Sequence, residues 1–199
     1  MSLTVFGTSR SRAFRVLWML EELGAPYEHH PLSWKDCATD PQYLEVNPAG
    51  TIPCVSDDGF VLAESLAINL YLSRKAGTLW PESVALQASA LQWSFWAATS
   101  LEVPYEAWAT HTRWLPEHLR EHRQAEAAAQ SLQRPLNLLE QHLAGRPYLL
   151  GQAFTVADLN VVSVIGLLRN FEPARRPSVT GWLNRCISRP GYAAAAKLP

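Results

Sequence analysis

A short polar loop near the N-terminus carries the side chains best suited to chemistry on a sulfur atom. It contains Ser9, Arg10, Ser11 and Arg12, and it directly precedes a helix predicted to begin at Ala13. A free thiol has a pKa of about 8.5 and the thiolate is the nucleophile, so a thiol must be activated at neutral pH. A donating hydroxyl, a helix N-terminus and nearby cations all favour the thiolate. The loop could therefore activate a bound thiol, although a helix cap with solvated arginines would have the same composition.

A second set of residues has the chemistry to hold a ligand by its backbone. Ile52 precedes Pro53 at the start of an apolar run, and a proline there marks a strand start or bend, because it lacks the N–H that a central strand needs. X-Pro bonds are also the only ones that readily become cis, and such a bend would turn the N–H and C=O of Ile52 outward. Glu64 and Ser65 lie where a strand runs into a helix, and helix N-termini attract carboxylates. Each feature alone is common, but together they predict a site for a small peptide-like ligand with one charged end.

The hydrophobic pattern predicts the elements that position these residues. In chain order they are a strand over 3–6, a helix over 13–23, a strand over 27–32, a hairpin turning at Asp58-Gly59, and a helix from 65 to about 75. Gly24 and Pro26 give the first helix its stop signal. This order predicts a thioredoxin-like α/β domain over residues 1–77, in which residues 33–42 fit no regular element.

An all-helical domain is predicted after a linker at residues 78–83, which carries Pro81 and follows Gly77. No strand signal recurs over 84–199, so the fold class is α+β, an α/β domain followed by a helical bundle. The predicted helices are 84–100, a piece over 105–114 after an interruption at Val103-Pro104, 116–144 with a kink at Pro135, and 179–188. The tail to residue 199 gives no specific signal.

Thr155 and Asp158 have the spacing of a capping box, with Phe154 and Leu159 placed to form a hydrophobic staple around it. A structural role explains this aspartate, so no carboxylate catalysis is inferred from it.

Composition excludes several classes of protein. The chain has 199 residues, 48% of them hydrophobic, and 17 basic against 18 acidic residues give a net charge of −1, so no nucleic-acid or anionic membrane partner is expected. No apolar run approaches the roughly 18 residues of a membrane span, and no signal-peptide core precedes the first arginines. The three scattered cysteines, Cys37, Cys54 and Cys186, fit a reducing, cytoplasmic location and form neither a metal knuckle nor a redox pair, and no metal is expected.

Two motifs carry a resemblance to a known family. The run NPAGTIP at residues 47–53, followed by AESLAI at 63–68, resembles the glutathione-binding half of the cytosolic glutathione transferases. The resemblance implies that glutathione is the co-substrate, that Ile52 and Pro53 hold its cysteinyl backbone, and that Glu64 and Ser65 hold its γ-glutamyl end. Many relatives carry a Lys or Arg at the position of Thr51. Because Thr51 has no charge, Lys35, beside Trp34, is a candidate to bind the glycyl carboxylate of glutathione in place of that cation. A surface position for both is the alternative.

The same resemblance assigns a thiol-activating donor to the polar loop. Counting forward from the first strand places Ser11 on the serine of serine-type relatives, whereas counting backward from Arg15-Val16 selects Arg10, and Ser9 is a third candidate. The loop has no cysteine, so a mixed disulfide with glutathione, as in glutaredoxin-like or omega-type relatives, is not expected.

The helical domain would supply the pocket for the second substrate. Trp96, Tyr105, Trp108 and His111 are candidates to line an apolar site, although aromatic stripes more commonly pack in cores. The expected function is conjugation of the glutathione thiolate to a small hydrophobic electrophile, a detoxification reaction, by a homodimer. The alternatives are a glutathione-dependent isomerase or dehalogenase, or a non-catalytic ligand-binding or protein-interaction protein of the same fold.

Overall fold

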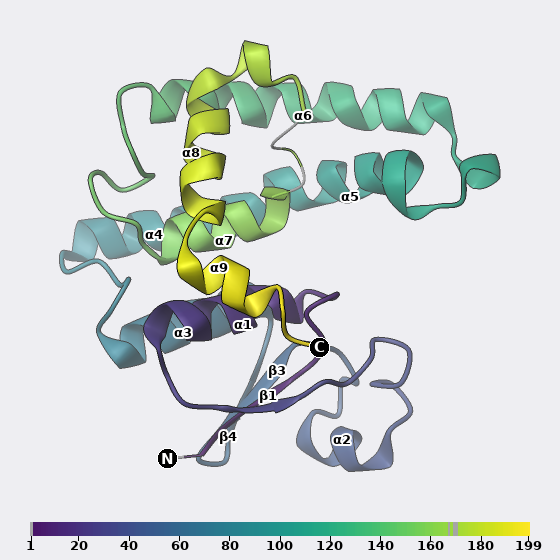
Figure 1. Ribbon diagram of the computed structural model, residues 1–199, viewed down its shortest axis with the longest axis vertical. Helices are drawn as coiled ribbons and strands as arrows, with labels where there is room; N and C mark the ends of the chain where they lie inside the picture. The colour runs from purple at the N-terminus through teal and green to yellow at the C-terminus, as the bar shows by residue number, and fades with distance from the viewer. Residues whose placement is uncertain (1, 167, 169–170) are drawn as a thin grey trace. The chain divides into compact units, whose positions relative to one another are not determined.

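The computed structural model describes residues 2–166, 168 and 171–199, which form two compact units (Figure 1). The first unit combines Met1–Glu82 with Ile187–Pro199, and the second is Ser83–Cys186. The first unit contains a sheet covered by helices, and the second is helical. The predicted α+β class is therefore confirmed, but residues 187–199, predicted to belong with the helical domain, pack with the first unit.

A mixed four-stranded sheet forms the centre of the first unit. Its strands are β1 (Leu3–Phe6), β2 (Glu28–His30), β3 (Cys54–Asp57) and β4 (Phe60–Ala63), in the spatial order β2-β1-β3-β4. β2 runs parallel to β1, whereas β3 is antiparallel to both β1 and β4. The four predicted strands are confirmed, although β2 is shorter than the predicted run over 27–32.

Helices α1 (Ala13–Leu23) and α3 (Ser65–Ala76) lie together beside the sheet (Figure 1). Both agree with the prediction, and α1 ends at Gly24 in the left-handed conformation that a C-terminal cap favours. The helix α2 (Pro41–Val46) lies where no element was predicted. Its start has a recognisable cause, because Asp40 accepts hydrogen bonds from the N–H groups of Gln42 and Tyr43, and a proline occupies the first turn.

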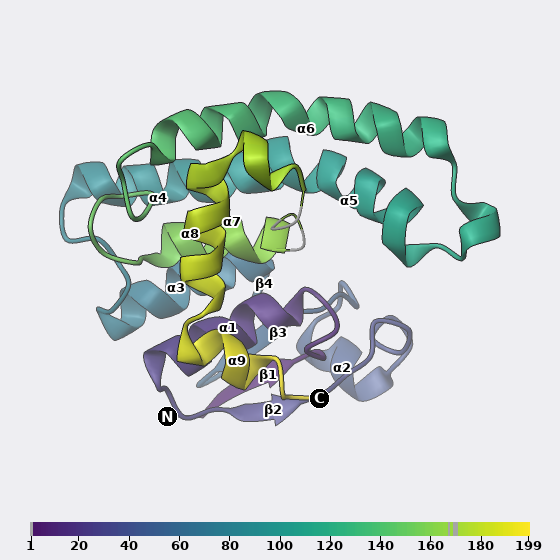
Figure 2. The ribbon, with the colours of Figure 1, turned by 45° about the horizontal axis from the view of Figure 1, so that its top comes forward.

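The C-terminal tail forms a helix, α9 (Pro190–Ala195), which lies along α1 (Figure 2). Tyr192 meets the rings of Phe14 and Trp18 edge-on, with centroids 5.1 Å apart in each pair. Arg189 pairs with the buried carboxylate of Glu22 at 2.7 Å. These aromatic and ionic contacts explain why a tail without a clear sequence signal packs on the first unit.

A buried aspartate braces the far end of β3. The side chain of Asp57 is 2% exposed, and its Oδ2 accepts hydrogen bonds from Tyr71 Oη at 2.6 Å and from the ammonium of Lys75, both on α3. Burial alone would raise the pKa of this carboxyl, but the hydrogen bonds from Lys75 and Tyr71 outweigh it and lower the pKa. The charged carboxylate therefore ties the sheet to α3.

The second unit consists of helices and short helical turns. They are α4 (Val84–Trp96), the π-helix η1 (Ala97–Glu102), α5 (Val103–Ala109), the π-helix η2 (Thr110–Trp114), the 3-10 turn η3 (Glu117–Leu119), α6 (His122–Leu143), α7 (Val156–Ile165), the 3-10 turn η5 (Pro173–Arg175) and α8 (Pro177–Ile187). α6 lies along α5, and α7 lies along α4 (Figure 2). Almost every residue of α7 is buried, so this helix forms the centre of the unit.

The largest differences from the prediction in this unit concern α5 and α6. The predicted interruption at Val103-Pro104 is wrong: Pro104 lies in the first turn of α5, where a proline is tolerated, and η1 leads directly into that turn. The helix predicted from Pro116 begins at His122 instead, after η3, and continues past Pro135.

The predicted capping box at α7 is confirmed, with reciprocal hydrogen bonds between Thr155 and Asp158. Asp158 is fully buried and also accepts from the N–H of Leu149 at 2.8 Å and from Trp182 Nε1 at 2.9 Å. Burial raises the pKa of this carboxyl, while the four hydrogen bonds that it accepts oppose the rise. Its role is to join α7 to α8 and to the loop before α7.

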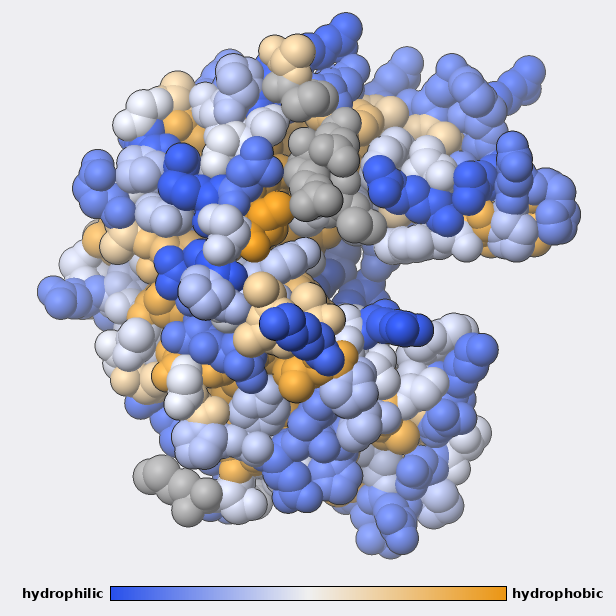
Figure 3. Space-filling model, viewed as in Figure 1, coloured by the Kyte–Doolittle hydropathy of each residue, from blue (hydrophilic) through white to orange (hydrophobic). Residues whose placement is uncertain are grey.

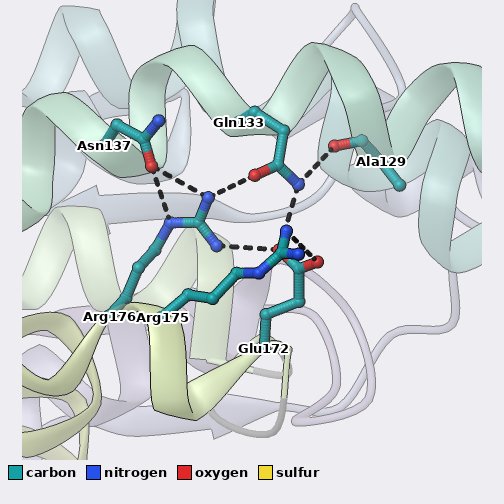
Figure 4. Close-up of polar contacts among 6 residues, drawn as sticks. All are labelled: Ala129, Gln133, Asn137, Glu172, Arg175 and Arg176. Carbon is teal, nitrogen blue, oxygen red and sulfur yellow. Dashed lines mark hydrogen bonds and ion pairs between the residues drawn. The ribbon is translucent and has the colours of Figure 1, made fainter.

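A buried arginine ties the segment before α8 to α6 (Figure 4). Arg176 is 3% exposed, and its guanidinium donates to Asn137 Oδ1 at 2.9 Å, to Gln133 Oε1, and to Glu172 Oε2 at 3.0 Å. Such a planar fork of donors cannot be reproduced by a lysine ammonium.

The outer surface shown in Figure 3 is mostly hydrophilic, with apolar side chains visible as separate patches. Among the described residues, no helix combines the length and the apolar character that crossing a membrane requires.

Replacing the buried arginine should destabilise the helical unit far more than replacing its neighbour. Arg176→Lys should lower the free energy of unfolding by about 2–3 kcal/mol, because hydrogen bonds to charged groups are lost inside the protein. Arg175→Lys, at a side chain 70% exposed and paired with the same Glu172, should change it by less than about 0.5 kcal/mol. Urea unfolding measures both values, and equal losses would contradict the assigned role of Arg176.

The Asp57 brace should make stability depend on pH. Because its folded-state pKa is lowered, its contribution is present above the unfolded-state pKa of about 3.9 and is lost as pH falls through the folded-state value. At neutral pH, Asp57→Asn should therefore lower the free energy of unfolding by about 1–3 kcal/mol, and the difference from the wild type should shrink below about pH 4. Asp36→Asn, at an exposed aspartate, is the control. If the loss of unfolding free energy caused by Asp57→Asn were the same at every pH, the charge of the Asp57 carboxylate would not contribute to stability.

Candidate functional site

The register of the sheet brings three chain segments to one edge. Phe6, the last residue of β1, pairs with Cys54, the first residue of β3, and Cys54 pairs in turn with Ala63, the last residue of β4. Paired residues of neighbouring strands lie side by side, so the residues just beyond them are neighbours as well. The segments that meet here are the loop 7–12, the pair Ile52–Pro53 and the pair Glu64–Ser65. These segments carry most of the residues predicted to bind and activate a thiol ligand.

Gly7 shows how closely the first two segments approach. Its φ is +125°, and a Cβ atom at this position would lie 2.6 Å from Ala13 Cβ and 3.3 Å from Ile52 Cβ. Its N–H donates to His30 O at 2.9 Å, and its carbonyl oxygen lies 2.7 Å from His29 Nε2. A glycine is required here because the φ is positive and because a Cβ atom would collide with Ala13 at the start of α1 and crowd Ile52.

The two loop serines both make hydrogen bonds within the chain. Ser9 donates its hydroxyl to Leu198 O at 2.6 Å and its N–H to Pro199 O at 2.7 Å. Ser11 donates its hydroxyl to Thr8 O at 2.8 Å. A serine hydroxyl has one proton, so each serine would have to release its carbonyl partner before donating to a sulfur atom.

Arg10, the third candidate donor, is exposed, and so is Arg12. Their position at the start of α1 adds positive charge beside a helix N-terminus, whose own partial charge is also positive. The electrostatics of the loop therefore favour an anion.

The start of α3 holds the third segment. Glu64 adopts a positive φ of 71°, which turns the chain from β4 into the helix, and Ser65 is the first helical residue. The hydroxyl of Ser65 accepts a hydrogen bond from Arg15 Nη1 at 3.2 Å. Although its side chain is charged, Arg15 is only 7% exposed. This buried cation links the first turns of α1 and α3, and the sequence pattern gave no signal for it.

The Ile52–Pro53 peptide bond is cis, and Pro53 is buried. The preceding carbonyl, that of Thr51, accepts hydrogen bonds from Tyr43 Oη at 2.5 Å and from Asn47 Nδ2 at 2.9 Å. Neither donor was among the predicted site residues, although Asn47 belongs to the NPAGTIP run.

Lys35 is not joined to this edge of the sheet. Its ammonium lies 5.6 Å from the ring centroid of Trp34, and both side chains are exposed. No hydrogen bond or ion pair between described residues connects Lys35 with Ile52, Glu64 or their neighbours. Its assignment to the glycyl carboxylate stays a prediction.

The four predicted pocket residues lie on the continuous helical run from α4 to η2. Trp96 meets Trp93 edge-on with centroids 5.0 Å apart, whereas Tyr105 and Trp108 contact each other at 6.4 Å. His111 accepts a hydrogen bond at Nδ1 from the N–H of Glu121. Tyr105 is 7% exposed, so part of this set serves the core of the unit.

All three cysteines are buried, and none of them forms a disulfide bond. Cys54 follows Pro53 directly, and burial raises its thiol pKa, so it is a poor candidate for a nucleophilic thiolate. Among the residues that the structure describes, no group of three or more His, Cys, Asp or Glu is placed to hold a metal ion.

Two family models match the chain. Residues 1–74 match the N-terminal domain of glutathione S-transferase, and residues 104–190 match its C-terminal domain. Together these matches cover most of the chain and both of its compact units.

Similar proteins carry two kinds of name. Glutathione S-transferase 3 of Schizosaccharomyces pombe is 28% identical over 204 residues, covering 94% of this chain and 84% of that protein. Elongation factor 1-gamma of Carassius auratus is 35% identical over 160 residues, covering 77% of this chain. This chain spans only about a third of that relative, 35% of its length.

A solved structure matches across both units. The theta class glutathione S-transferase of Xanthomonas axonopodis pv. citri, solved with glutathione bound, has a TM-score of 0.90 and 27% identity, covering 98% of this chain and 97% of that one. The predicted fold, a thioredoxin-like domain followed by an all-helical one, is confirmed. The chain therefore belongs to the cytosolic glutathione transferase family.

Proposed function

We propose that this chain binds glutathione and transfers its thiolate to a small hydrophobic electrophile. The observation that carries the proposal is the pairing of Phe6, Cys54 and Ala63, which gathers the loop 7–12, Ile52–Pro53 and Glu64–Ser65 at one edge of the sheet. Glutathione is a tripeptide with a carboxylate at each end and a thiol in the middle. Its chemistry matches an edge that offers backbone groups, a helix N-terminus and a polar loop.

The binding roles follow from the chemistry of each segment. The backbone of Ile52, ahead of the buried Pro53, pairs with the cysteinyl part of glutathione. Glu64 and Ser65 hold the γ-glutamyl end at the start of α3, where the first N–H groups have no partner within the helix. The buried cation of Arg15, 3.2 Å from Ser65 Oγ, adds positive charge beside them. Glutathione bound to the Xanthomonas protein, which has the same fold, supports this proposal.

Thiol activation is assigned to Ser11, with Arg10 and Ser9 as the alternatives. Ser11 precedes α1, and its hydroxyl would turn from Thr8 O towards the glutathione sulfur. A hydrogen bond to the sulfur and the positive field of the loop would both lower the thiol pKa. Ser9 is less suited because the C-terminal segment engages both its hydroxyl and its N–H.

The helical unit supplies the electrophile site in this proposal. Trp96, Tyr105, Trp108 and His111 provide aromatic surface for an apolar substrate. Homodimer formation, a cytoplasmic location and a role in detoxification belong to the same proposal. Support for a dimer comes from the large apolar side chains that α4 and α5 expose, including Phe95 at 65% and Val103 at 66%.

A second candidate function is glutathione binding without conjugation. One observation favours it: both loop serines donate their only hydroxyl proton to backbone carbonyls. The similarity to proteins named elongation factor 1-gamma agrees with it, because this domain pair also occurs in proteins not named as transferases. A glutathione-dependent isomerase or dehalogenase would use the same thiolate on another electrophile.

Retention on immobilised glutathione, followed by an assay of glutathione consumption with an activated aryl chloride and an isothiocyanate, tests the proposal. The wild type should be retained and should consume thiol faster than the uncatalysed reaction. Ser65→Ala should weaken glutathione binding about tenfold, because it removes a hydrogen bond to a charged group. Ser73→Ala, in the same helix but bonded to Leu70 O, should leave binding unchanged.

The two functions give different results in this experiment. Retention without consumption of any electrophile would favour the binding protein. A wild-type protein that is neither retained nor active would contradict both.

The loop residue that donates a hydrogen bond to the glutathione sulfur can be identified from the thiol pKa of bound glutathione, which is measured from thiolate absorbance across pH. Ser11→Ala should raise that pKa by about 1 to 2 and slow conjugation at neutral pH accordingly, since a hydrogen bond to the thiolate is lost. Ser9→Ala should have little effect. If only Arg10→Ala raised the pKa, the assignment of Ser11 would be wrong.

A further inference from the structure

One backbone carbonyl of the first unit is held by two side-chain donors at once. Thr51 O accepts hydrogen bonds from Tyr43 Oη at 2.5 Å and from Asn47 Nδ2 at 2.9 Å. Tyr43 is 3% exposed and Asn47 is 6% exposed, whereas Thr51 itself is exposed. The carbonyl is thus drawn towards the interior at a surface position.

The direction of this carbonyl determines the direction of the next N–H. The Thr51–Ile52 peptide is planar and trans, so its C=O and its N–H point in opposite directions. With the Thr51 carbonyl drawn inward, the N–H of Ile52 must point outward. Among the described residues, that N–H has no hydrogen-bond acceptor. An outward donor without a protein partner is available to a ligand.

The two donors are themselves firmly placed. Asn47 Nδ2 also lies 3.3 Å from Tyr43 Oη, and its Oδ1 accepts from the N–H of Ala49. Tyr43 packs in a core cluster with Cys37 and Cys54. Burial raises the pKa of Tyr43 to about 12, so its hydroxyl keeps its proton and remains a donor at physiological pH.

We propose that Tyr43 and Asn47 are positioning residues for glutathione, which preset the Thr51–Ile52 peptide so that the N–H of Ile52 donates to a backbone carbonyl of the ligand. The inference rests on the proposed function. Neither side chain is assigned a contact with the ligand; both act through the orientation of a peptide plane. A site oriented before binding loses less conformational entropy when the ligand arrives.

Calorimetric titration of the 199-residue chain with glutathione tests this role. Tyr43→Phe removes one donor and keeps the ring, and Asn47→Asp keeps the shape but replaces the donor with an acceptor. Each should raise the Kd for glutathione by about three- to tenfold, the size expected for the loss of one hydrogen bond.

The matched control is Tyr71→Phe. It removes the same kind of hydroxyl, bonded to Asp57 at the opposite end of β3, and so costs stability without touching the Thr51–Ile52 peptide. Its Kd for glutathione should equal that of the wild type. Thermal unfolding of each variant without ligand shows that the titrations compare folded proteins.

An NMR readout separates orientation from general loosening. On addition of glutathione, the amide resonance of Ile52 should move in the wild type and in Tyr71→Phe, and it should move less in Tyr43→Phe and Asn47→Asp. The inference would be overturned if Tyr43→Phe and Asn47→Asp kept the wild-type affinity for glutathione, or if the control Tyr71→Phe lost as much affinity as they did. In either case, glutathione binding by the wild type would leave the proposed function standing. Failure of the wild type to bind would overturn both.

Discussion

The pairing register of three short strands is the constraint on which the candidate site depends. Because Phe6, Cys54 and Ala63 lie side by side, the chain leaves or enters the sheet three times at one edge. A slip of one residue would turn each strand's side chains to the opposite face of the sheet and would also displace the segments that follow. The brace formed by Asp57, Tyr71 and Lys75 at the other end of β3 helps to hold this register.

Local packing then decides how close the three segments come. Gly7 allows the first loop to lie against Ile52, and Arg15 connects the first turns of α1 and α3 through Ser65. Backbone geometry and two helix starts therefore account for most of what this edge could offer a peptide ligand.

Much of this architecture could be predicted because its signals are local. The strands, α1, α3 and the capping box at Thr155 and Asp158 follow from hydrophobic periodicity and from turn or cap residues close in sequence. Asp40 ahead of a proline is a local signal for the start of α2. The segment around it is polar and shows no helical hydrophobic periodicity, so no helix was predicted there.

The features that could not be predicted arise from contacts between residues far apart in sequence. α9 is held by aromatic contacts with α1 and by an ion pair with Glu22, 167 residues earlier. Arg15 is buried, and its guanidinium donates a hydrogen bond to Ser65, 50 residues later in the chain. The hydrogen bonds of Ser9 to the C-terminal segment belong to the same class, and they make Ser9 less suited than Ser11 to donate to a sulfur atom.

The central claim is that one edge of the sheet, where three segments meet, is the glutathione site. A crystal structure of the chain with glutathione tests it most directly. The account predicts that the cysteinyl backbone of glutathione pairs with Ile52, that its γ-glutamyl carboxylate lies at the start of α3 beside Ser65, and that its sulfur faces the loop 7–12. Glutathione bound elsewhere, or this edge covered by the protein's own side chains, would contradict it.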